Sequence, residues 1–313
     1  MARCLIACGS NLGDRARALD DAVCELQRAP RTQVETHSRW HETKAVGGAQ
    51  QPSYLNGAIV VNTELGSLEL LTITQQIEAR LGRAEEQRRE RWGVRTIDLD
   101  LLLYEEQMVV HAGAIELPDR HGFTWPIALL EIPHPRLVFR RFVLEPASEI
   151  AGNWRHPLLP YTLRELQQRL LPQRLQPSPV IAVAGDRTGP TDETGPSPAV
   201  VQAIAGRAAA AVGLPPPHSL GGVELLRRIP SGDQPDRSAT ANGSIDPQLL
   251  VILADLPVQV TGQPECYGGR VVGQTVIERR WWTSPRIYVS ARDADWAVRE
   301  IAAIWTALQP ADA

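Results

Sequence analysis

The stretch RTIDLDLLLY, residues 95–104, decides the fold, because it carries two acids into a run that is otherwise typical of a buried strand. Side chains alternate along a strand, so Asp98 and Asp100 share a face, with their Cα atoms about 6.5 Å apart. At an effective dielectric constant of about 20, their charges repel by about 2.5 kcal/mol. A solvated acidic face on an edge strand would explain the pair, although the following Leu101–Leu103 favours a central strand. A bound Mg²⁺ would also explain it, since oxygen ligands suit that ion. The spacing alone leaves these two interpretations about even.

Charged residues on both sides of this stretch favour a bound nucleotide. Gln75 and Glu78 lie three apart in a helical pattern, on one stripe and off its apolar face. Acids for a metal together with arginines for oxyanions are what a nucleoside triphosphate requires. Each arginine alone is better explained as surface charge, so the assembly carries the argument. The cationic residues are Arg83, Arg88, Arg89, Arg91 and Arg95 before the acids, and His134, Arg136, Arg140 and Arg141 after them.

Outward from this stretch, residues 1–170 alternate strands and helices. Strands are expected at residues 3–9, 32–43 and 55–65, and a helix at residues 14–29. A second helix follows Ser67, which can cap it. The order strand, helix, strand, strand, helix, strand predicts an α+β sandwich of ferredoxin-like type, with RTIDLDLLLY as its last strand.

The second half predicts a smaller α/β domain over residues 181–313, after a proline-rich linker at residues 171–180. The runs VIAVAG (180–185) and LLVILADLP (249–257) are typical of buried parallel strands, and residues 199–214 and 293–308 of helices. The first run weakly resembles the start of a nucleoside-kinase-like P-loop domain. A phosphate loop needs a lysine, and Lys44 is the only lysine in the chain. We therefore expect a degenerate P-loop-like domain without kinase activity. A structural or self-association role is favoured over a ligand-binding module or an unrecognised enzyme.

Composition excludes several classes of protein. The 313 residues carry a net charge of −4, which argues against a general nucleic-acid binder. No apolar run approaches the roughly 20 residues that cross a bilayer, and the N-terminus does not have the pattern of a signal peptide. Cys4, Cys8, Cys24 and Cys266 form no CxxC pair, which predicts reduced thiols and a cytoplasmic location without membrane partners.

Five motifs, in order, resemble the 6-hydroxymethyl-7,8-dihydropterin pyrophosphokinase family of the folate pathway. Gly9-Ser10-Asn11 alone is a weak signal, since a strand-to-helix turn with a capping side chain explains it as well. The five together are specific and cover most of residues 1–170. They are GSNLGDR (9–15), ETKAVGGAQQPSYLNGA (42–58), TQQIEARLGR (74–83), RWGVRTIDLDLLLY (91–104) and IPHPRLVFRRFVLEPASEI (132–150).

The resemblance implies transfer of pyrophosphate from ATP to the pterin hydroxymethyl group, with release of AMP. It implies that Asp98 and Asp100 hold two Mg²⁺ ions and that the nearby arginines act on the phosphates. The remaining roles it implies are catalysis by Arg83 and Arg95, ATP contacts by Gln75, Glu78, His134 and Arg140, and pterin contacts by Thr43, Tyr54, Asn56, Trp92 and Phe142. Tyr54 and Phe142 would sandwich the ring, Asn56 and the backbone around Thr43 would read its edge, and Trp92 would lie on a closing loop.

Two departures and two alternatives remain. The loop after Arg83 is slightly longer than is usual in the family, so which of Arg83, Arg88, Arg89 and Arg91 acts in catalysis is open. Residues 111–131 look inserted, in a region where the family contacts ATP. A catalytically silent nucleotide- or pterin-binding scaffold is one alternative, and a metal-dependent phosphohydrolase is the other. The joint presence of acids, arginines and ring-stacking residues favours the pyrophosphokinase.

Overall fold

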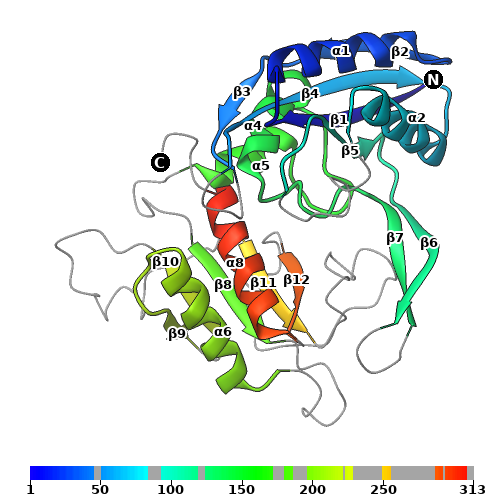
Figure 1. Cartoon of the computed structure of the whole chain (residues 1–313). Helices are drawn as coiled ribbons and strands as arrows, with labels where there is room; N and C mark the ends of the chain where they lie inside the picture. The colour runs from blue at the N-terminus through cyan, green and yellow to red at the C-terminus, as the bar shows by residue number, and fades with distance from the viewer. Residues whose placement is uncertain are drawn as a thin grey trace. The chain divides into compact units, whose positions relative to one another are not determined.

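The computed structural model describes ten stretches of the chain, which form two compact units. The first unit is built from residues 1–113 and 128–168, and the second from residues 114–127 and 169–308. Of the predicted linker at residues 171–180, only the first and last positions are described. The stretches, coloured in chain order in Figure 1, are residues 1–45, 51–83, 93–118, 124–171, 180–185, 196–220, 223–227, 249–254, 286–291 and 293–308.

The first unit is an α+β fold on an antiparallel sheet. The sheet has the order β2-β4-β1-β5, with β3 pairing to β4. Its strands are β1 (Ala2–Ser10), β2 (Thr32–His37), β3 (His41–Thr43), β4 (Tyr54–Thr63) and β5 (Asp98–Tyr104). Its helices are α1 (Arg15–Arg28), α2 (Ser67–Arg80), α4 (Arg141–Ala151) and α5 (Leu163–Leu170). β5 stands at the end of this strand order, so the expectation that its leucine run marks a central strand was wrong. Leu101–Leu103 are buried all the same, because α2 packs beside β5 and the segment at His134 bonds to its outer edge.

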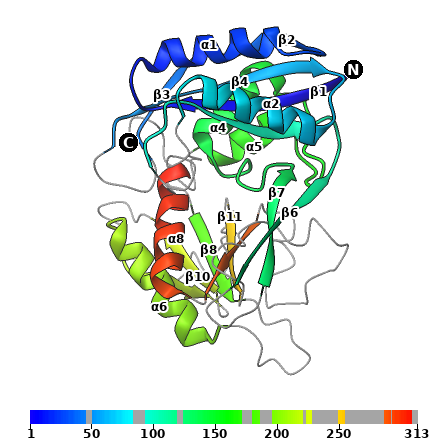
Figure 2. The same cartoon turned by 45° about the vertical axis from the view of Figure 1, so that its right-hand side comes forward.

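The two faces of this sheet pack against different helices. Side chains alternate along each strand, so neighbouring residues point to opposite faces. Cys4, Ile6 and Cys8 of β1 belong to the core that includes the buried residues of α1 and α2. The other face of β1 carries Ala7 and Gly9, and α4 packs against β4 and β1. Figures 1 and 2 show α1 and α2 on one side of the sheet and α4 and α5 on the other. The functional residues lie on the α4 side.

Two local predictions for this unit were wrong. Residues 32–43 form two strands instead of one, because the buried Ser38 interrupts the pairing and its hydroxyl accepts a hydrogen bond from the Ala58 N–H at 3.0 Å. Ser67 is the first residue of α2 and not its cap. The N-cap is Gly66, whose N–H donates to the Glu69 carboxylate at 2.8 Å.

Of the segment that looked inserted, residues 111–118 and 124–131 belong to a strand pair, and residues 119–123 lie outside the described residues. β6 (Val109–Pro118) and β7 (Thr124–Ile132) form a separate two-stranded sheet. The chain then returns to the first unit, where the His134 N–H donates to the Leu102 carbonyl at 2.9 Å. β6 therefore follows β5 along the chain, and the residues after β7 return next to the same strand.

The second unit is a mixed α/β sheet in the order β12-β11-β8-β10-β9. β8 and β12 run parallel to β11, which confirms the parallel strands predicted at residues 180–185 and, over residues 249–254, at 249–257; residues 255–257 lie outside the described stretches. β10 is antiparallel to β8 and β9. The predicted helices are confirmed as α6 and α8, which pack on each other. The elements are β8 (Val180–Gly185), α6 (Pro198–Ala211), β9 (His218–Leu220), β10 (Val223–Arg227), β11 (Leu249–Ala254), β12 (Arg286–Ser290) and α8 (Ala294–Leu308).

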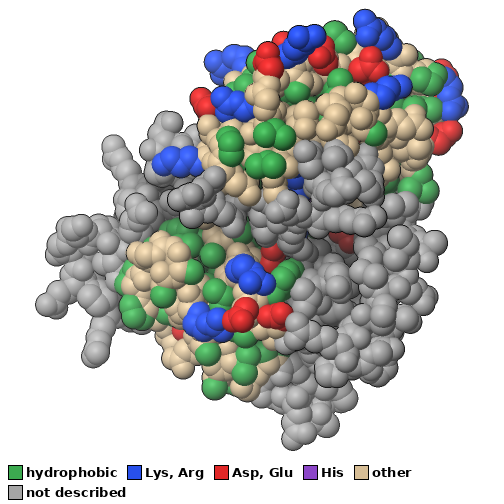
Figure 3. Space-filling view, viewed as in Figure 1, with side chains coloured by type: hydrophobic (Ala, Val, Ile, Leu, Met, Phe, Trp, Pro, Cys, Tyr) green, Lys and Arg blue, Asp and Glu red, His purple; other side chains and the backbone are tan. Residues whose placement is uncertain are grey.

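The structure also bears on the expectations about membrane spans, thiols and surface charge. Within the described stretches, no helix combines the length and apolar character that crossing a bilayer demands. Cys4, Cys8 and Cys24 are free thiols, while Cys266 lies outside the described residues. Figure 3 shows basic and acidic side chains interspersed on the visible face of the first unit. The cytoplasmic location stays a prediction.

Candidate active site

A cleft on the α4 side of the first sheet collects most of the predicted site residues. It lies where β1, β4 and β5 meet the start of α4, so residues from four distant parts of the sequence converge on it. Its lining includes Thr43, Tyr54, Asn56, Arg95, Asp98, Asp100, Arg140 and Phe142, together with Ala7, Gly9 and Lys44.

Strand register sets the floor of this cleft. Gly9 of β1 is paired with Asn56 of β4 on one side and with Asp98 of β5 on the other. Neighbouring strands lie about 4.8 Å apart, so Asn56 and Asp98 stand in one row about 10 Å from each other. A Cβ atom on Gly9 would come within 2.9 Å of the Asn56 Oδ1 atom. Glycine at this position therefore lets the amide of Asn56 lie against β1.

Asp98 and Asp100 both line the cleft but have different partners. The Asp98 carboxylate receives Arg83 Nη1 at 2.7 Å and Arg95 Nη1 at 2.5 Å, one arginine on each oxygen. The Asp100 carboxylate has Arg140 at 3.8 Å and His134 at 4.0 Å, both too far for hydrogen bonds. The side chain of Asp100 is also more exposed, at 37% against 20% for Asp98. Arginines thus offset the repulsion at Asp98, whereas Asp100 keeps oxygens available to a ligand.

Glu78 is buried, which corrects the prediction that it lies off the apolar face of its helix. α2 packs beside β5, so the Glu78 carboxylate accepts the Leu99 N–H at 2.7 Å and Arg83 Nη1 at 2.5 Å. Burial raises the pKa of Glu78 to about 7, although the Arg83 charge opposes that rise. Glu78 holds Arg83 and the start of β5 together. Gln75, one turn earlier, is half-buried, and neither residue is in the cleft lining.

His134 faces Asp100 with a defined tautomer. The Arg136 N–H donates to Nδ1 of His134 at 3.1 Å, so a neutral imidazole carries its proton on Nε2, the atom nearest Asp100. Burial lowers the pKa of His134 well below its ordinary value, and the charges of Arg140 and Arg136 lower it further. Burial also lowers the pKa of Arg140, to about 10, so that side chain is charged at neutral pH. Asp100 therefore has a neutral histidine and a cationic arginine beside it, although His134 itself is not in the cleft lining.

Two aromatic rings and a side-chain amide also line the cleft. Tyr54 starts β4, and its hydroxyl donates to the Gly93 carbonyl at 3.2 Å. Phe142 lies in the first turn of α4, with the Arg140 guanidinium 5.7 Å from its ring centroid. The Asn56 side-chain amide donates to the Thr43 hydroxyl at 2.7 Å, which fixes its orientation. Two rings and a fixed amide suit a flat ring with a polar edge.

Several site predictions remain without structural detail, and one charged lining residue was missed. Trp92, Arg88, Arg89 and Arg91 lie outside the described residues. Arg83 is described, with its side chain 8% exposed between Glu78 and Asp98. Lys44 lines the cleft although the sequence assigned it no role there; its status as the only lysine was the available signal.

Paired carboxylates facing arginines, next to an aromatic slot, are typical of enzymes that transfer phosphoryl-type groups from a nucleotide. Residues 5–152 match the profile of the family described as 7,8-dihydro-6-hydroxymethylpterin-pyrophosphokinase (HPPK). The 2-amino-4-hydroxy-6-hydroxymethyldihydropteridine pyrophosphokinase of Bacillus subtilis is 40% identical over 145 residues, covering 46% of this chain and 75% of the relative. That of Pseudomonas aeruginosa is 34% identical over 155 residues, covering 50% of this chain and 84% of the relative. This chain belongs to that family, which makes it a pyrophosphokinase of folate biosynthesis.

Solved structures align over about half of this chain. A crystal structure of HPPK-DHPS in complex with substrates aligns with a TM-score of 0.40 and 13% identity, over 53% of this chain and 43% of that chain. The family assignment rests on the sequence relatives. Those two relatives align with half of this chain or less, and the matched residues 5–152 end before the second unit apart from its residues 114–127.

Proposed function

We propose that the first unit transfers pyrophosphate from ATP to the hydroxymethyl group of 6-hydroxymethyl-7,8-dihydropterin, releasing AMP. The observation that carries this proposal is a single cleft that brings two aromatic rings and Asn56 together with an acid–arginine cluster, with Asn56 and Asp98 about 10 Å apart across three strands. That separation suits a flat ring at one end and a polyphosphate at the other.

At the phosphate end, Asp98 and Asp100 would hold two Mg²⁺ ions that arrive with ATP. The available oxygens of Asp100 fit this role, since oxygen ligands suit Mg²⁺. At Asp98, one of its two arginines has to turn from the carboxylate to the phosphates when an ion binds there. Bound at this pair, the ions would neutralise the carboxylates and align the phosphates. Arg83 and Arg95, the arginines already at Asp98, are then our candidates for catalytic contact with the transferred group.

The remaining nucleotide contacts are assigned to the residues around Asp100 and on α2. The positive charge of Arg140 would pair with a phosphate oxygen, and the Nε2–H of the neutral His134 would donate a hydrogen bond to the nucleotide phosphates. Gln75 and Glu78 would seat the nucleotide from α2. Because Glu78 is engaged with Leu99 and Arg83, it contributes partly by holding Arg83 in place.

At the pterin end, Tyr54 and Phe142 would sandwich the ring. Asn56 and the backbone around Thr43 would read its polar edge, and Trp92 would cover the ring. Since the Asn56 amide nitrogen donates to the Thr43 hydroxyl, its conformation is set before substrate binds.

The reaction that we propose is a direct in-line attack of the substrate hydroxyl oxygen on the β-phosphorus, which breaks the bond to the α-phosphate oxygen and leaves AMP. Positioning and charge neutralisation supply most of the catalysis in this type of transfer. We assign no general base.

We also propose a fold class for the first unit and a role for the second unit. The β2-β4-β1-β5 order with α1 and α2 on one face supports the ferredoxin-like class. The second unit is proposed as a degenerate P-loop-like domain with a structural or self-association role. Its β8 ends at Gly185, where a Cβ atom would meet the Val201 side chain at 3.0 Å, and no lysine follows Lys44.

The test is incubation of the full chain with ATP, Mg²⁺ and the hydroxymethyl dihydropterin, with chromatographic separation of the nucleotides. We expect one AMP for each pterin consumed, and no AMP when the pterin is omitted. ADP would indicate a different phosphotransferase. Phosphate or pyrophosphate released without pterin would indicate the phosphohydrolase, and binding of both substrates without turnover a silent scaffold.

A further inference from the structure

The motif GSNLGDR, residues 9–15, contributes only Gly9 to the cleft lining, yet two of its other side chains bond to segments that reach the cleft. Asn11 is 1% exposed, so its amide has to be satisfied inside the protein. The bonds of this amide connect the end of β1 to the nucleotide end of the proposed site.

Asn11 forms hydrogen bonds with both the carbonyl and the N–H of the Arg95 backbone. The Asn11 N–H donates to the Arg95 carbonyl at 3.0 Å, and the Arg95 N–H donates to Asn11 Oδ1 at 2.7 Å. The side-chain oxygen thus takes the place of the backbone carbonyl in a strand bridge. Arg95 precedes β5, and its guanidinium reaches Asp98 at 2.5 Å. Fixing the backbone at Arg95 therefore fixes the origin of a long side chain that has to reach the reacting phosphates.

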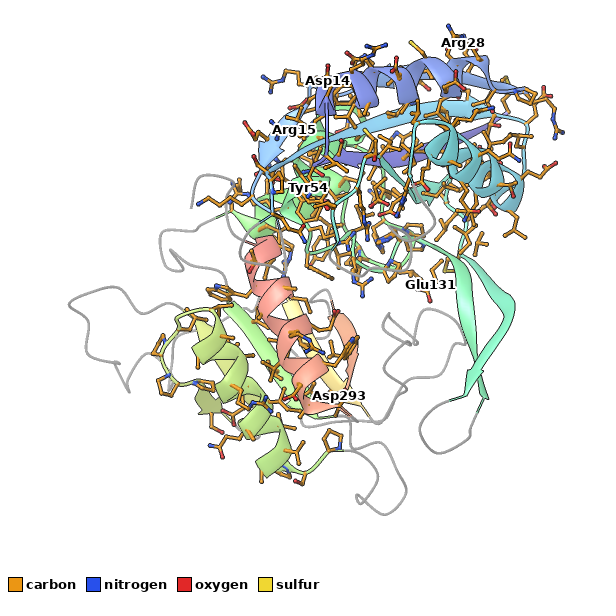
Figure 4. All side chains as sticks on the ribbon, viewed as in Figure 1. Asp14, Arg15, Arg28, Tyr54, Glu131 and Asp293 are labelled. Carbon is orange, nitrogen blue, oxygen red and sulfur yellow. The ribbon has the colours of Figure 1, made fainter. Side chains whose placement is uncertain are left out.

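The same turn also holds the segment before Tyr54. Asn11 Nδ2 lies 3.4 Å from both the Gln51 side-chain oxygen and the Pro52 carbonyl, the long limit for hydrogen bonds. Arg15 adds shorter bonds, to the Ser53 carbonyl at 2.7 Å and to the Glu42 carboxylate at 2.9 Å. Figure 4 marks Arg15 at the start of α1 and Tyr54 at the start of β4.

Capping of α1 does not explain Asn11. Asp14 caps this helix, with its carboxylate accepting the Arg17 N–H at 3.1 Å, and Gly13 supplies the left-handed turn at a φ of 71°. We propose that Asn11 is a positioning residue that aligns Arg95 for the nucleotide by bonding the Arg95 backbone N–H through its side-chain oxygen. This inference rests on the proposed function, because Arg95 acts on the phosphates only if ATP is the co-substrate.

Asn11→Ala in the full chain tests the inference against two matched variants. Asn11→Asp keeps the acceptor for the Arg95 N–H, and Asp14→Ala removes the neighbouring helix cap, which changes stability without touching Arg95. We expect Asn11→Ala to lower kcat/KM for ATP by about tenfold to hundredfold, since small misplacements of contact groups have effects of that size. Asn11→Asp should recover most of this loss, and Asp14→Ala should keep the wild-type value while lowering the melting temperature.

A double-mutant cycle decides whether Asn11 acts through Arg95. If it does, Asn11→Ala combined with Arg95→Ala is no weaker in ATP affinity than Arg95→Ala alone, because the positioned group is already absent. Titration calorimetry with ATP and Mg²⁺ measures that affinity even where turnover is too slow. Losses that multiply in the double variant, or wild-type kinetics in Asn11→Ala, overturn the inference. AMP release by the wild-type chain is measured first, so failure of the proposed function is seen separately.

Discussion

The two sheets of this chain place charge differently. In the first, β5 carries Asp98 and Asp100 into a cleft where arginines face them. In the second, β8 and β11 read VIAVAG and LLVILA, without a charged residue. The buried acid of the second sheet is Glu224 on β10, and its Oε2 atom has no hydrogen-bond partner among the described residues. Acids that face cations in a cleft indicate a functional site, whereas one buried acid without such neighbours does not indicate one.

The difference matches the extent of the sequence relatives. Residues 5–152 match the pyrophosphokinase profile, and they contain the whole cleft. The second unit has a packed core of its own, including Ile181, Val251 and Ile301, so it holds a fold without a comparable polar cluster among its described residues. We therefore expect changes in the first unit to affect activity and changes in the second to affect mainly its own stability.

The largest effect is expected from the paired acids. Asp98→Ala or Asp100→Ala should lower kcat by about a thousandfold or more, because removing a group that holds transition-state charge has effects of this order. Steady-state AMP release measures it, and circular dichroism checks that the unit stays folded. Glu64→Ala, at an exposed acid of the same unit, is the control and should keep wild-type turnover. Near-normal activity in either aspartate variant would refute the metal assignment.

The next effect is a pH dependence confined to the first unit. His156 is buried there, and burial lowers its pKa from 6.5 to about 4. The unfolded chain takes up a proton near pH 6.5 and the folded chain does not, so the free energy of unfolding falls between about pH 6.5 and 4, by about 3 kcal/mol in total. Above pH 6.5 both states are neutral and this contribution is complete.

Urea unfolding of the wild type and of His156→Gln between pH 7 and pH 4.5 measures this dependence. The variant should lose the part of the pH slope that comes from this side chain, while His37→Gln, at an exposed histidine, should retain it. Equal slopes in wild type and His156→Gln would show that the imidazole titrates alike in both states.

A smaller effect is expected at the aromatic end of the cleft. Tyr54→Ala should raise KM for the pterin by about tenfold, since an aromatic pair contributes about 0.5–1.5 kcal/mol beyond its buried area. Tyr54→Phe keeps the ring and loses only the 3.2 Å hydrogen bond to the Gly93 carbonyl, so its KM should stay close to wild type. If both variants lose affinity equally, the hydroxyl and not ring stacking is the contact that matters.

The smallest effect on activity should come from the second unit. Ile301 on α8 is fully buried, and Ile301→Asn should destabilise that unit by about 3 kcal/mol, while kcat/KM changes by no more than about twofold. Leu26→Asn, at a fully buried position of α1, is the matched change in the first unit and should lower both stability and activity. Loss of AMP release in Ile301→Asn would mean that the second unit supports catalysis.

Much of the site could be predicted because it depends on local patterns. A period of two puts Asp98 and Asp100 on one face, and the motifs around Tyr54, Asn56 and Phe142 resemble a family whose ring-binding site is known. The burial of Glu78 could not be predicted, because it depends on how α2 packs beside β5 and not on the stripe of its own helix. The break at Ser38 was missed for a similar reason, since its hydroxyl accepts the backbone N–H of Ala58, which lies 20 residues away.

By itself, the sequence determined most of the order of the elements up to residue 104, the family and the residue types that line the cleft, since periodicity and motifs are properties of neighbouring residues. Only the tertiary structure decided that Gly9 stands between Asn56 and Asp98, that two arginines share Asp98 while Asp100 keeps oxygens available, and that Asn11 holds Arg95 instead of capping a helix. These facts depend on strand register and on contacts between distant segments, because a buried charge or amide is satisfied by whichever group the fold brings within hydrogen-bond distance.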